Sequence, residues 1–242
     1  MPVLTSQVIA EPVSASCRLR LVWQNPSTRQ FIEVGTLDSL GDQNEYVFQY
    51  SDAARAAGFV PLVEFPDLKA TYTSSTLPAF FANRVMSTRR RSYRDYLAWL
   101  GLSDVPTPME VLARSGGGRA TDTFHVVDSF AEVAGRRQGR FFASGLSHVD
   151  GVGERLLRLR PGQPLYLEDE PGNPVNRLAI RLSVDADEPV GWVPDWLVDD
   201  VHSMRDTQLS VTVSVDQVNV EAPDHLKLLC LLEALGAVPS LP

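Results

Sequence analysis

The sequence is poor in the residues that build metal sites, disulfide frameworks and many catalytic centres. Two cysteines and four histidines occur among 242 residues. Cys17 and Cys230 lie in apolar contexts near opposite ends, which predicts buried free thiols and fits a reducing, cytoplasmic setting. The histidines are scattered, and neither cysteine has a partner at a spacing typical of zinc sites. We therefore expect no metal, no cofactor and no enzymatic activity.

Long hydrophobic runs are also lacking. No segment approaches the ~20 apolar residues of a membrane span. Residues 1–16 lack the basic start and apolar centre of a secretory signal. A hydrophobic content of 44% is ample for one large domain or two small ones, each with its own core. We expect a cytoplasmic protein without a membrane partner.

Positive charge is scarce in one half of the chain. Residues 1–138 hold 14 lysines and arginines against 14 acidic residues, whereas residues 139–242 hold 8 against 16. The whole net charge of −8 therefore belongs to the C-terminal part. Nucleic-acid binding draws most of its affinity from cations placed on phosphates, so this division argues against it there and favours a basic protein partner.

Alternating apolar and polar residues predict a small antiparallel meander in the first half. The strands are expected at residues 18–24, 31–37 and 46–50, with a closing strand at 124–127. Three- and four-residue apolar spacing predicts a helix over residues 77–100. Shorter helices are expected at 52–57 and 109–113, the second after Pro108.

The second half combines short strands with turn signals, which predicts a small β-barrel. Strands are expected at residues 140–144, 164–168, 178–184, 191–193 and 209–220, and residues 154–159 precede a Pro161-Gly162 turn. A helix over 196–204 is expected to cap the barrel. Asp224 as N-cap, with Leu226, Leu229 and Leu232, predicts a final amphipathic helix.

These patterns predict an α+β protein of two domains. A tail (1–17) precedes a sheet-plus-helix domain (18–134). A Gly-Arg-Arg-Gln-Gly linker (135–139) leads to a barrel with capping helices (140–242).

Four motifs of the second half resemble the HIRAN domain in order and spacing, over about a third of the chain. They are Phe142-Ala-Ser-Gly-Leu, Leu159-Arg-Pro-Gly-Gln-Pro-Leu-Tyr-Leu, Glu170-Pro-Gly-Asn-Pro-Val-Asn-Arg-Leu-Ala-Ile and Val190-Gly-Trp-Val-Pro. The resemblance implies a modified OB-like β-barrel. It also implies capture of the 3′ end of single-stranded DNA, as in the best-studied members.

The pocket of that family is only partly kept. Asn173 and Pro174 match it, whereas Val175 replaces a tyrosine whose stacking on a base is worth about 1–3 kcal/mol. Asn176 replaces an aspartate and can still bond a hydroxyl. The contacts that the resemblance implies are Ser147 (in place of an arginine), His148 (in the aromatic position), Asn173, Pro174, Asn176 and Arg177.

The first half resembles the first N-terminal subdomain of HipA-type Ser/Thr kinases over roughly residues 18–125. The matching pieces are short: Val34-Gly-Thr-Leu, Tyr46-Val-Phe-Gln-Tyr, Leu77-Pro-Ala-Phe-Phe-Ala-Asn, and Leu100-Gly-Leu leading to Leu112-Ala. The ATP-binding and catalytic segments of the kinases have no counterpart in the sequence. The resemblance implies a neutralising partner of a HipA-like kinase in a toxin–antitoxin system.

Several residues allow two interpretations. Arg84, Arg89, Arg90, Arg91 and Arg94 form a dense basic patch that suits phosphates, or a solvated helix face. Asn173 and Asn176 either bond a ligand or build a turn. His148 either stacks on a base or is structural. Trp192 and Trp196 are more typical of core and cap. Residues 115–119 (Ser-Gly-Gly-Gly-Arg) lack the Gly-Lys-Ser/Thr ending of a phosphate-binding loop, which favours a connector.

The leading hypothesis is a non-enzymatic adaptor. Its second half would bind single-stranded DNA or DNA 3′ ends through a weakened HIRAN pocket, and its first half would pair with a HipA-like kinase. The alternative is a pure protein–protein interaction module, in which the acidic half docks on a basic partner and nucleic acid plays no role.

Overall fold

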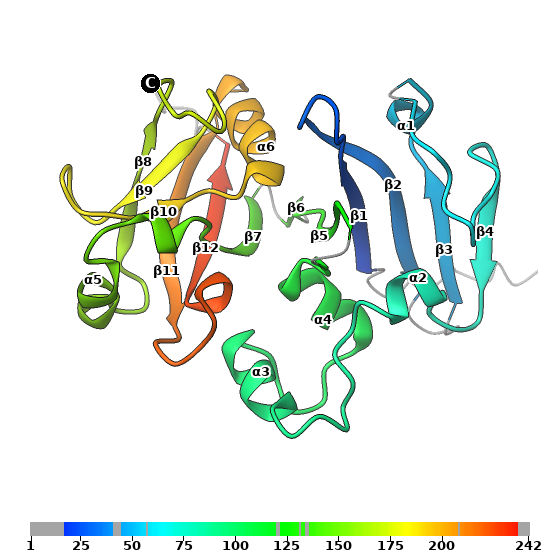
Figure 1. The fold of residues 1–242 in the computed structure, drawn as a ribbon, viewed down its shortest axis with the longest axis horizontal. Coiled ribbons are helices and arrows are strands. Elements are labelled where there is room, and N and C mark those ends of the chain that lie inside the picture. Colours follow the sequence, from blue (N-terminus) through cyan, green and yellow to red (C-terminus); the bar gives the residue numbers. More distant parts are fainter. Residues whose placement is uncertain are drawn as a thin grey trace, which may run out of the picture.

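The computed structural model describes residues 17–40, 45–56, 58–119, 122–130, 132–133, 136–207 and 209–236. Two antiparallel sheets stand side by side, with the helices α3 and α4 below them and α6 between their upper ends in the view of Figure 1. Chains that mix helices with antiparallel sheets in this way form the α+β class, as predicted. No helix among the described residues is long and apolar enough to cross a membrane.

The first sheet has the strand order β4-β3-β2-β1-β5, antiparallel throughout. Its buried face carries Leu19, Leu21, Leu37 and Phe48, all fully buried. The predicted meander and the closing strand are confirmed. The bounds are β1 (Cys17–Gln24), β2 (Phe31–Leu40), β3 (Glu45–Tyr50), β4 (Thr71–Ser74) and β5 (Phe124–Asp128).

The long helix predicted in this half is divided in the structure, whereas the two short helices are present. The helix expected over residues 77–100 is wrong as one element, because the structure has α2 (Ala79–Ala82) and α3 (Tyr93–Trp99) with an irregular segment between them. The helical spacing of apolar residues is interrupted at residues 87–92, where serines, a threonine and three arginines provide no apolar side chain for burial. Helix α1 spans Asp52–Ala56, and α4 (Pro108–Ser115) begins with a Thr107/Glu110 capping box.

The second sheet has seven strands in the order β10-β9-β8-β11-β12-β7-β6. It curls, because Ser144, just after β7, forms a bridge with Trp192 at the end of β10. Trp192 N–H donates to the Ser144 carbonyl at 3.0 Å, and Ser144 N–H donates to the Trp192 carbonyl at 2.9 Å. The bounds are β6 (Glu132–Val133), β7 (Arg136–Phe142), β8 (Pro164–Asp169), β9 (Ile180–Ser183), β10 (Pro189–Trp192), β11 (Ser210–Val218) and β12 (Leu228–Leu235).

Two glycines permit this closure. A Cβ on Gly191 would lie 2.8 Å from the Ser144 carbonyl oxygen, and one on Gly145 would lie 2.6 Å from the Trp192 ring. Both residues also have a positive φ, 144° and 70°. Close backbone approach and positive φ are the two conditions that favour glycine. The Ser-Gly-Leu and Val-Gly-Trp sequences therefore belong to the closure of the sheet.

One predicted helix of this half is wrong, and the segment before the Pro161-Gly162 turn is helical. The final helix predicted from Asp224 is wrong: only the 3₁₀ turn η3 (Asp224–Leu226) is helical, and β12 follows. Leu228, Leu229 and Cys230 are all fully buried, because β12 lies inside the sheet between β11 and β7. Residues 152–158 form a helix, α5 (Val152–Arg158), while the predicted cap is confirmed as α6 (Asp195–Asp206).

The predicted linker is also different in the structure. Residues 136–139 begin β7 and pair with β12, and Gly135 lies outside the described residues. Most of the predicted tail (1–17) is likewise outside them, and Cys17 opens β1.

Several contacts join the two halves. The Arg20 side chain donates to Asp200 of α6, and the Asn219 amide donates to the Trp99 carbonyl. A small core also spans both halves, with Leu97, Leu100 and Val111 packed against Ala222 and Leu226. The separation of the chain into two domains stays a prediction, but the halves share packed and hydrogen-bonded contacts.

Candidate nucleic-acid interface

The loop that follows β8 is organised around the Glu170 carboxylate. Trp192 Nε1 donates to Glu170 Oε2 at 2.8 Å, and Asn173 Nδ2 donates to the same oxygen at 2.7 Å. Because these hydrogen bonds stabilise the charged form, they hold the pKa of Glu170 below its ordinary value. Glu170 thus ties the loop to the end of β10, where the sheet closes.

The two asparagines of the loop are used in its own structure. Asn173 Oδ1 accepts from the backbone N–H groups of Val175 and Asn176 at 2.9 and 3.2 Å. Asn176 Nδ2 donates to Asp195 at 2.9 Å, and its Oδ1 accepts from the Leu178 N–H at 2.9 Å. The geometry is that of Asx turns, which supports the turn interpretation of both residues.

The other residues predicted for this pocket are exposed to solvent. Ser147 and His148 belong to the exposed end of the 3₁₀ turn η2 (Leu146–His148), which starts at Gly145 against the Trp192 ring. Pro174 and Arg177 are exposed on the loop. Trp192 is half-buried; its ring lies against Gly145 at the start of η2, and its indole N–H is bound to Glu170 at the start of the loop. The structure thus brings the predicted pocket residues to one edge of the curled sheet.

Arg84 does not belong to the exposed basic patch predicted for it. Its side chain is only 1% exposed and forms an ion pair with Asp122 at 2.6 Å. Nη1 also donates to the Gly117 carbonyl at 2.8 Å, and the guanidinium lies 4.3 Å from the centre of the Phe80 ring. Arg84 is therefore an internal anchor of the glycine segment, and its prediction as a phosphate ligand on the surface is wrong.

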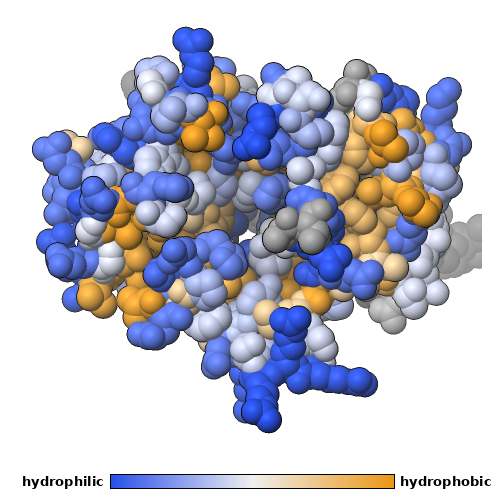
Figure 2. All heavy atoms as spheres, viewed as in Figure 1, coloured by the Kyte–Doolittle hydropathy of each residue, from blue (hydrophilic) through white to orange (hydrophobic). Residues whose placement is uncertain are grey.

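The remaining four arginines of the patch are free. Arg89, Arg90, Arg91 and Arg94 are exposed, and within the described residues none of them forms an ion pair or a side-chain hydrogen bond. They lie on α3 and on the segment before it. In Figure 2 hydrophilic side chains project from this end of the molecule. The patch and the Trp192 edge are separate surfaces.

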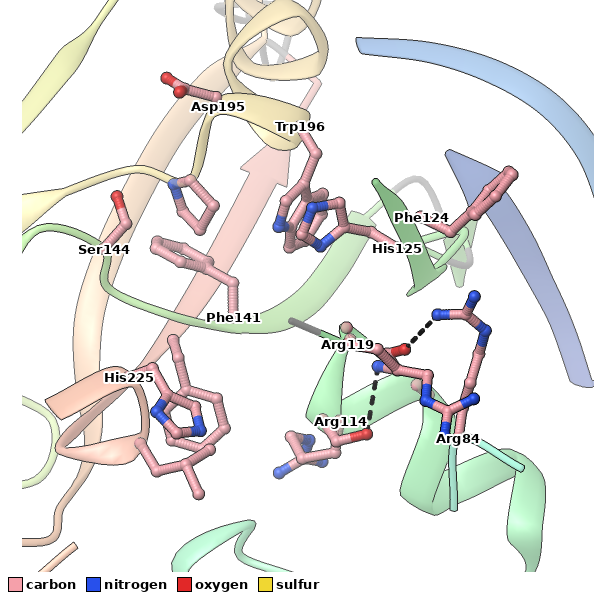
Figure 3. Close-up of a pocket in the computed structure, with 18 of the residues that line it drawn as sticks. Arg84, Arg114, Arg119, Phe124, His125, Phe141, Ser144, Asp195, Trp196 and His225 are labelled. Atoms are coloured by element: carbon pink, nitrogen blue, oxygen red, sulfur yellow. Dashed lines mark hydrogen bonds between the residues drawn. The ribbon is translucent and has the colours of Figure 1, made fainter. Parts of the chain in front are cut away.

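Sequence reasoning missed a cleft between the two halves (Figure 3). It has a volume of about 530 Å³, and Arg114, Arg140, His125 and Trp196 are among its lining residues. The signal in the sequence was the Ser-Gly-Gly-Gly-Arg segment at 115–119, which also lines it. Its partners come from residues as distant as Phe31 and Leu226, which one sequence does not connect.

The thiols have little nucleophilic character. Burial raises the pKa of the half-buried Cys17 to about 11 and the pKa of the fully buried Cys230 still further. The thiolate is the reactive form of cysteine, so both side chains are poor nucleophiles near neutral pH. In the part of the chain that the structure describes, no three His, Cys, Asp or Glu side chains converge as a metal site.

These features define a class of α+β proteins with a curled, nearly closed antiparallel sheet and a loop-lined edge. No protein-family model matches the chain, and no curated protein matches it either. Two solved structures are similar to it. A protein from Lactobacillus plantarum has 18% identity over 41% of this chain and 97% of its own, with a TM-score of 0.35. The HIRAN domain of human HLTF has 17% identity over 41% of this chain and 74% of its own, with a TM-score of 0.31.

Proposed function

We propose that the protein is a non-enzymatic binding protein for single-stranded nucleic acid. The observation that carries the proposal is the cluster of four exposed arginines, Arg89, Arg90, Arg91 and Arg94, whose side chains have no partner among the described residues. Cations of this kind supply the sequence-independent part of nucleic-acid affinity. The chain has 30 acidic residues against 22 basic ones, so phosphate binding requires a local cluster of cations such as this one.

The edge around Trp192 gives the proposal its second contact. His148, Pro174 and Arg177 are exposed on η2 and on the neighbouring loop, and the resemblance of the sequence to the HIRAN domain suggests that a nucleic-acid strand would bind there. The amide groups of Asn173 and Asn176 are already hydrogen-bonded within the loop. The proposal therefore includes contact with the strand at this edge but assigns no hydroxyl contact to the asparagines. A strand with a blocked 3′ end is expected to bind as well as one with a free 3′ hydroxyl.

A salt titration tests the proposal. Binding of a fluorescein-labelled single-stranded oligothymidylate is followed by anisotropy over a range of salt concentrations. The slope of log K against log salt is negative, and each lost phosphate contact reduces its magnitude by about 0.7 for single strands. The double variant Arg90→Gln/Arg94→Gln is expected to reduce the magnitude of this slope by about 1.4.

The matched control removes two positive charges elsewhere, by Lys69→Gln/Arg158→Gln. Both of these side chains are exposed and lie outside the arginine cluster. The control is expected to leave the slope nearly unchanged. Equal slopes for the two double variants, or no binding at low salt, would overturn the proposal.

The charge of the second half favours a second candidate. With 8 basic against 16 acidic residues, it suits docking on a basic protein partner. Absence of strand binding together with salt-sensitive binding of a polylysine probe would favour this alternative. A HipA-like kinase partner and a toxin–antitoxin role stay predictions from the sequence resemblance.

A further inference from the structure

The cleft between the halves is built from segments that are far apart in the sequence. One wall consists of β5 and the glycine segment that follows α4, residues 116–118. The other wall consists of β7 and the first turn of α6, with η3 at the side. A volume of about 530 Å³ is within the range of small-molecule sites. The site does not include the exposed arginine cluster, so it is independent of the function proposed above.

Arginines dominate the polar lining of the cleft. Arg84, Arg114, Arg119 and Arg140 line it against two acids, Asp122 and Asp195, in a chain whose net charge is −8. Both acids are already engaged. Asp122 is paired with Arg84, and Asp195 accepts the Asn176 amide. Arg140 is itself paired with Asp216, so four arginines stand against three carboxylates and the balance of charge around the cleft stays positive.

Two of these guanidinium groups are held in place with donors to spare. Arg114 Nη1 donates to the Leu100 carbonyl at 2.8 Å, and Arg140 Nε donates to Asp216 at 2.9 Å. These bonds engage one nitrogen of each side chain, while a guanidinium has five N–H donors. Burial and the nearby charge of Arg140 lower the pKa of Arg114. An anion between them would relieve that repulsion.

Arg119 adds an exposed donor at the end of the glycine segment. It is exposed and forms no ion pair with the described residues. Gly116 and Gly117 have φ of 72° and 54°, and the bond from Arg84 to the Gly117 carbonyl fixes the segment that leads to it. The cleft thus combines two held guanidinium groups with a third at its rim.

Aromatic side chains line the same cleft. Trp196 from α6 and His125 from β5 point into it, and Phe124 and Phe141 also line it (Figure 3). Burial, and then the charge of Arg84, lower the pKa of His125, so the imidazole is neutral near neutral pH. A flat aromatic ring can stack on such groups without adding a charge.

We infer that this cleft binds a nucleoside phosphate, with its phosphate on Arg114, Arg119 and Arg140 and its base against Trp196 and His125. Arginine forks suit phosphate oxygens, and aromatic faces suit bases. The same chemistry is offered by a free nucleotide and by the terminal nucleotide of a 5′-phosphorylated strand.

Calorimetric titration of the full chain with AMP, adenosine, inorganic phosphate and a 5′-phosphorylated oligothymidylate tests the inference. AMP is expected to bind at least tenfold more tightly than adenosine or inorganic phosphate, because only AMP uses both parts of the cleft. Arg119→Gln is expected to weaken AMP binding about tenfold, as for loss of one charged hydrogen bond. Arg119 has no anchoring role in the fold, so this variant is expected to stay folded.

Arg94→Gln is the matched control, since it removes an exposed arginine outside the cleft. It is expected to leave AMP binding unchanged while lowering the salt slope of strand binding. If only the phosphorylated strand binds, and does so in an Arg119-dependent manner, the inference holds with the strand end as the source. The inference would be overturned if neither AMP nor the phosphorylated strand binds. It would also be overturned if AMP and inorganic phosphate bind with equal affinity, or if Arg119→Gln leaves binding unchanged. Binding of AMP does not depend on the exposed arginine cluster, whereas binding of an unphosphorylated strand does, so failure here and failure of the proposed function are distinguishable.

Discussion

The loop at 170–179 and the segment at 89–94 use their polar side chains in opposite ways. In the loop, Glu170, Asn173 and Asn176 are all hydrogen-bonded to neighbours in the chain. In the segment, four arginines have no partner among the described residues. Polar residues that the sequence marks as candidate ligands can therefore be hydrogen-bonded within the fold, while the side chains of a run of arginines stay exposed. Arg84 adds to the contrast. It lies five residues before Arg89 in the sequence, yet its side chain is bonded within the fold, as the side chains of the loop are.

The largest expected effect is that of Arg84→Met. The change leaves Asp122 without its ion-pair partner and removes the bond to Gly117. Loss of one partner of a buried pair costs about 3–5 kcal/mol, and partial exposure of Asp122 places the expected loss of unfolding free energy near the lower value. Urea denaturation measures it. Arg84→Met/Asp122→Asn is expected to recover part of the loss, and a single variant as stable as the parent would remove the contrast.

A smaller effect is expected for Asn173→Ala. The substitution removes a donor to Glu170 and the acceptor of two backbone N–H groups. Leaving such groups unpaired costs about 1–3 kcal/mol, reduced here because the loop is partly open to water. Thermal unfolding is the measurement, and Pro174→Ala on the same loop is the control. If both variants lower the Tm equally, the asparagine is not a turn-building residue.

The pH dependence of the loop tests its anchor. Because the pKa of Glu170 is depressed in the folded protein, its stabilising contribution is present above the ordinary pKa of 4.5 and is lost as pH falls through the folded value. The difference in Tm between the parent and Glu170→Gln is expected to be constant near neutral pH and to shrink in acid. A difference that stays constant into acid would show that the carboxylate charge is not the stabilising feature.

The smallest expected effect on stability is that of Arg90→Gln or Arg94→Gln. Neither side chain has a partner within the described residues, so the unfolding free energy is expected to stay within about 0.5 kcal/mol of the parent. Urea denaturation in parallel with Arg84→Met provides the comparison. A loss as large as that of Arg84→Met would mean that the exposed arginines also anchor the fold.

Most of the sheet architecture could be predicted from the sequence, because alternation and turn residues act locally. β1, β2 and β3 follow from the alternation around Leu19, Val34 and Phe48. The segment of β12 was predicted as a helix because Leu226, Leu229 and Leu232 stand three residues apart, and residues 228–232 form a continuous apolar run. Such a run fits a helix or a strand buried on both faces, and only the neighbouring strands decide between them.

The candidate site was less predictable, because it depends on which side chains meet. The Asx turns of Asn173 and Asn176 involve only neighbouring residues, and turn building was one of the two interpretations drawn from the sequence. Burial of Arg84 depends on Asp122, 38 residues further along the chain, and no local pattern indicates it. The cleft requires Arg114 and Trp196 to come from different halves.

The place of β12 has a consequence for how the chain folds during synthesis. β7 is complete at Phe142, but its pairing partner begins only at Leu228, and Arg136 pairs with Leu235. The first sheet can form once β5 has been made, at Asp128. The second sheet has to wait for nearly a hundred further residues, with the apolar face of β7 uncovered in the meantime.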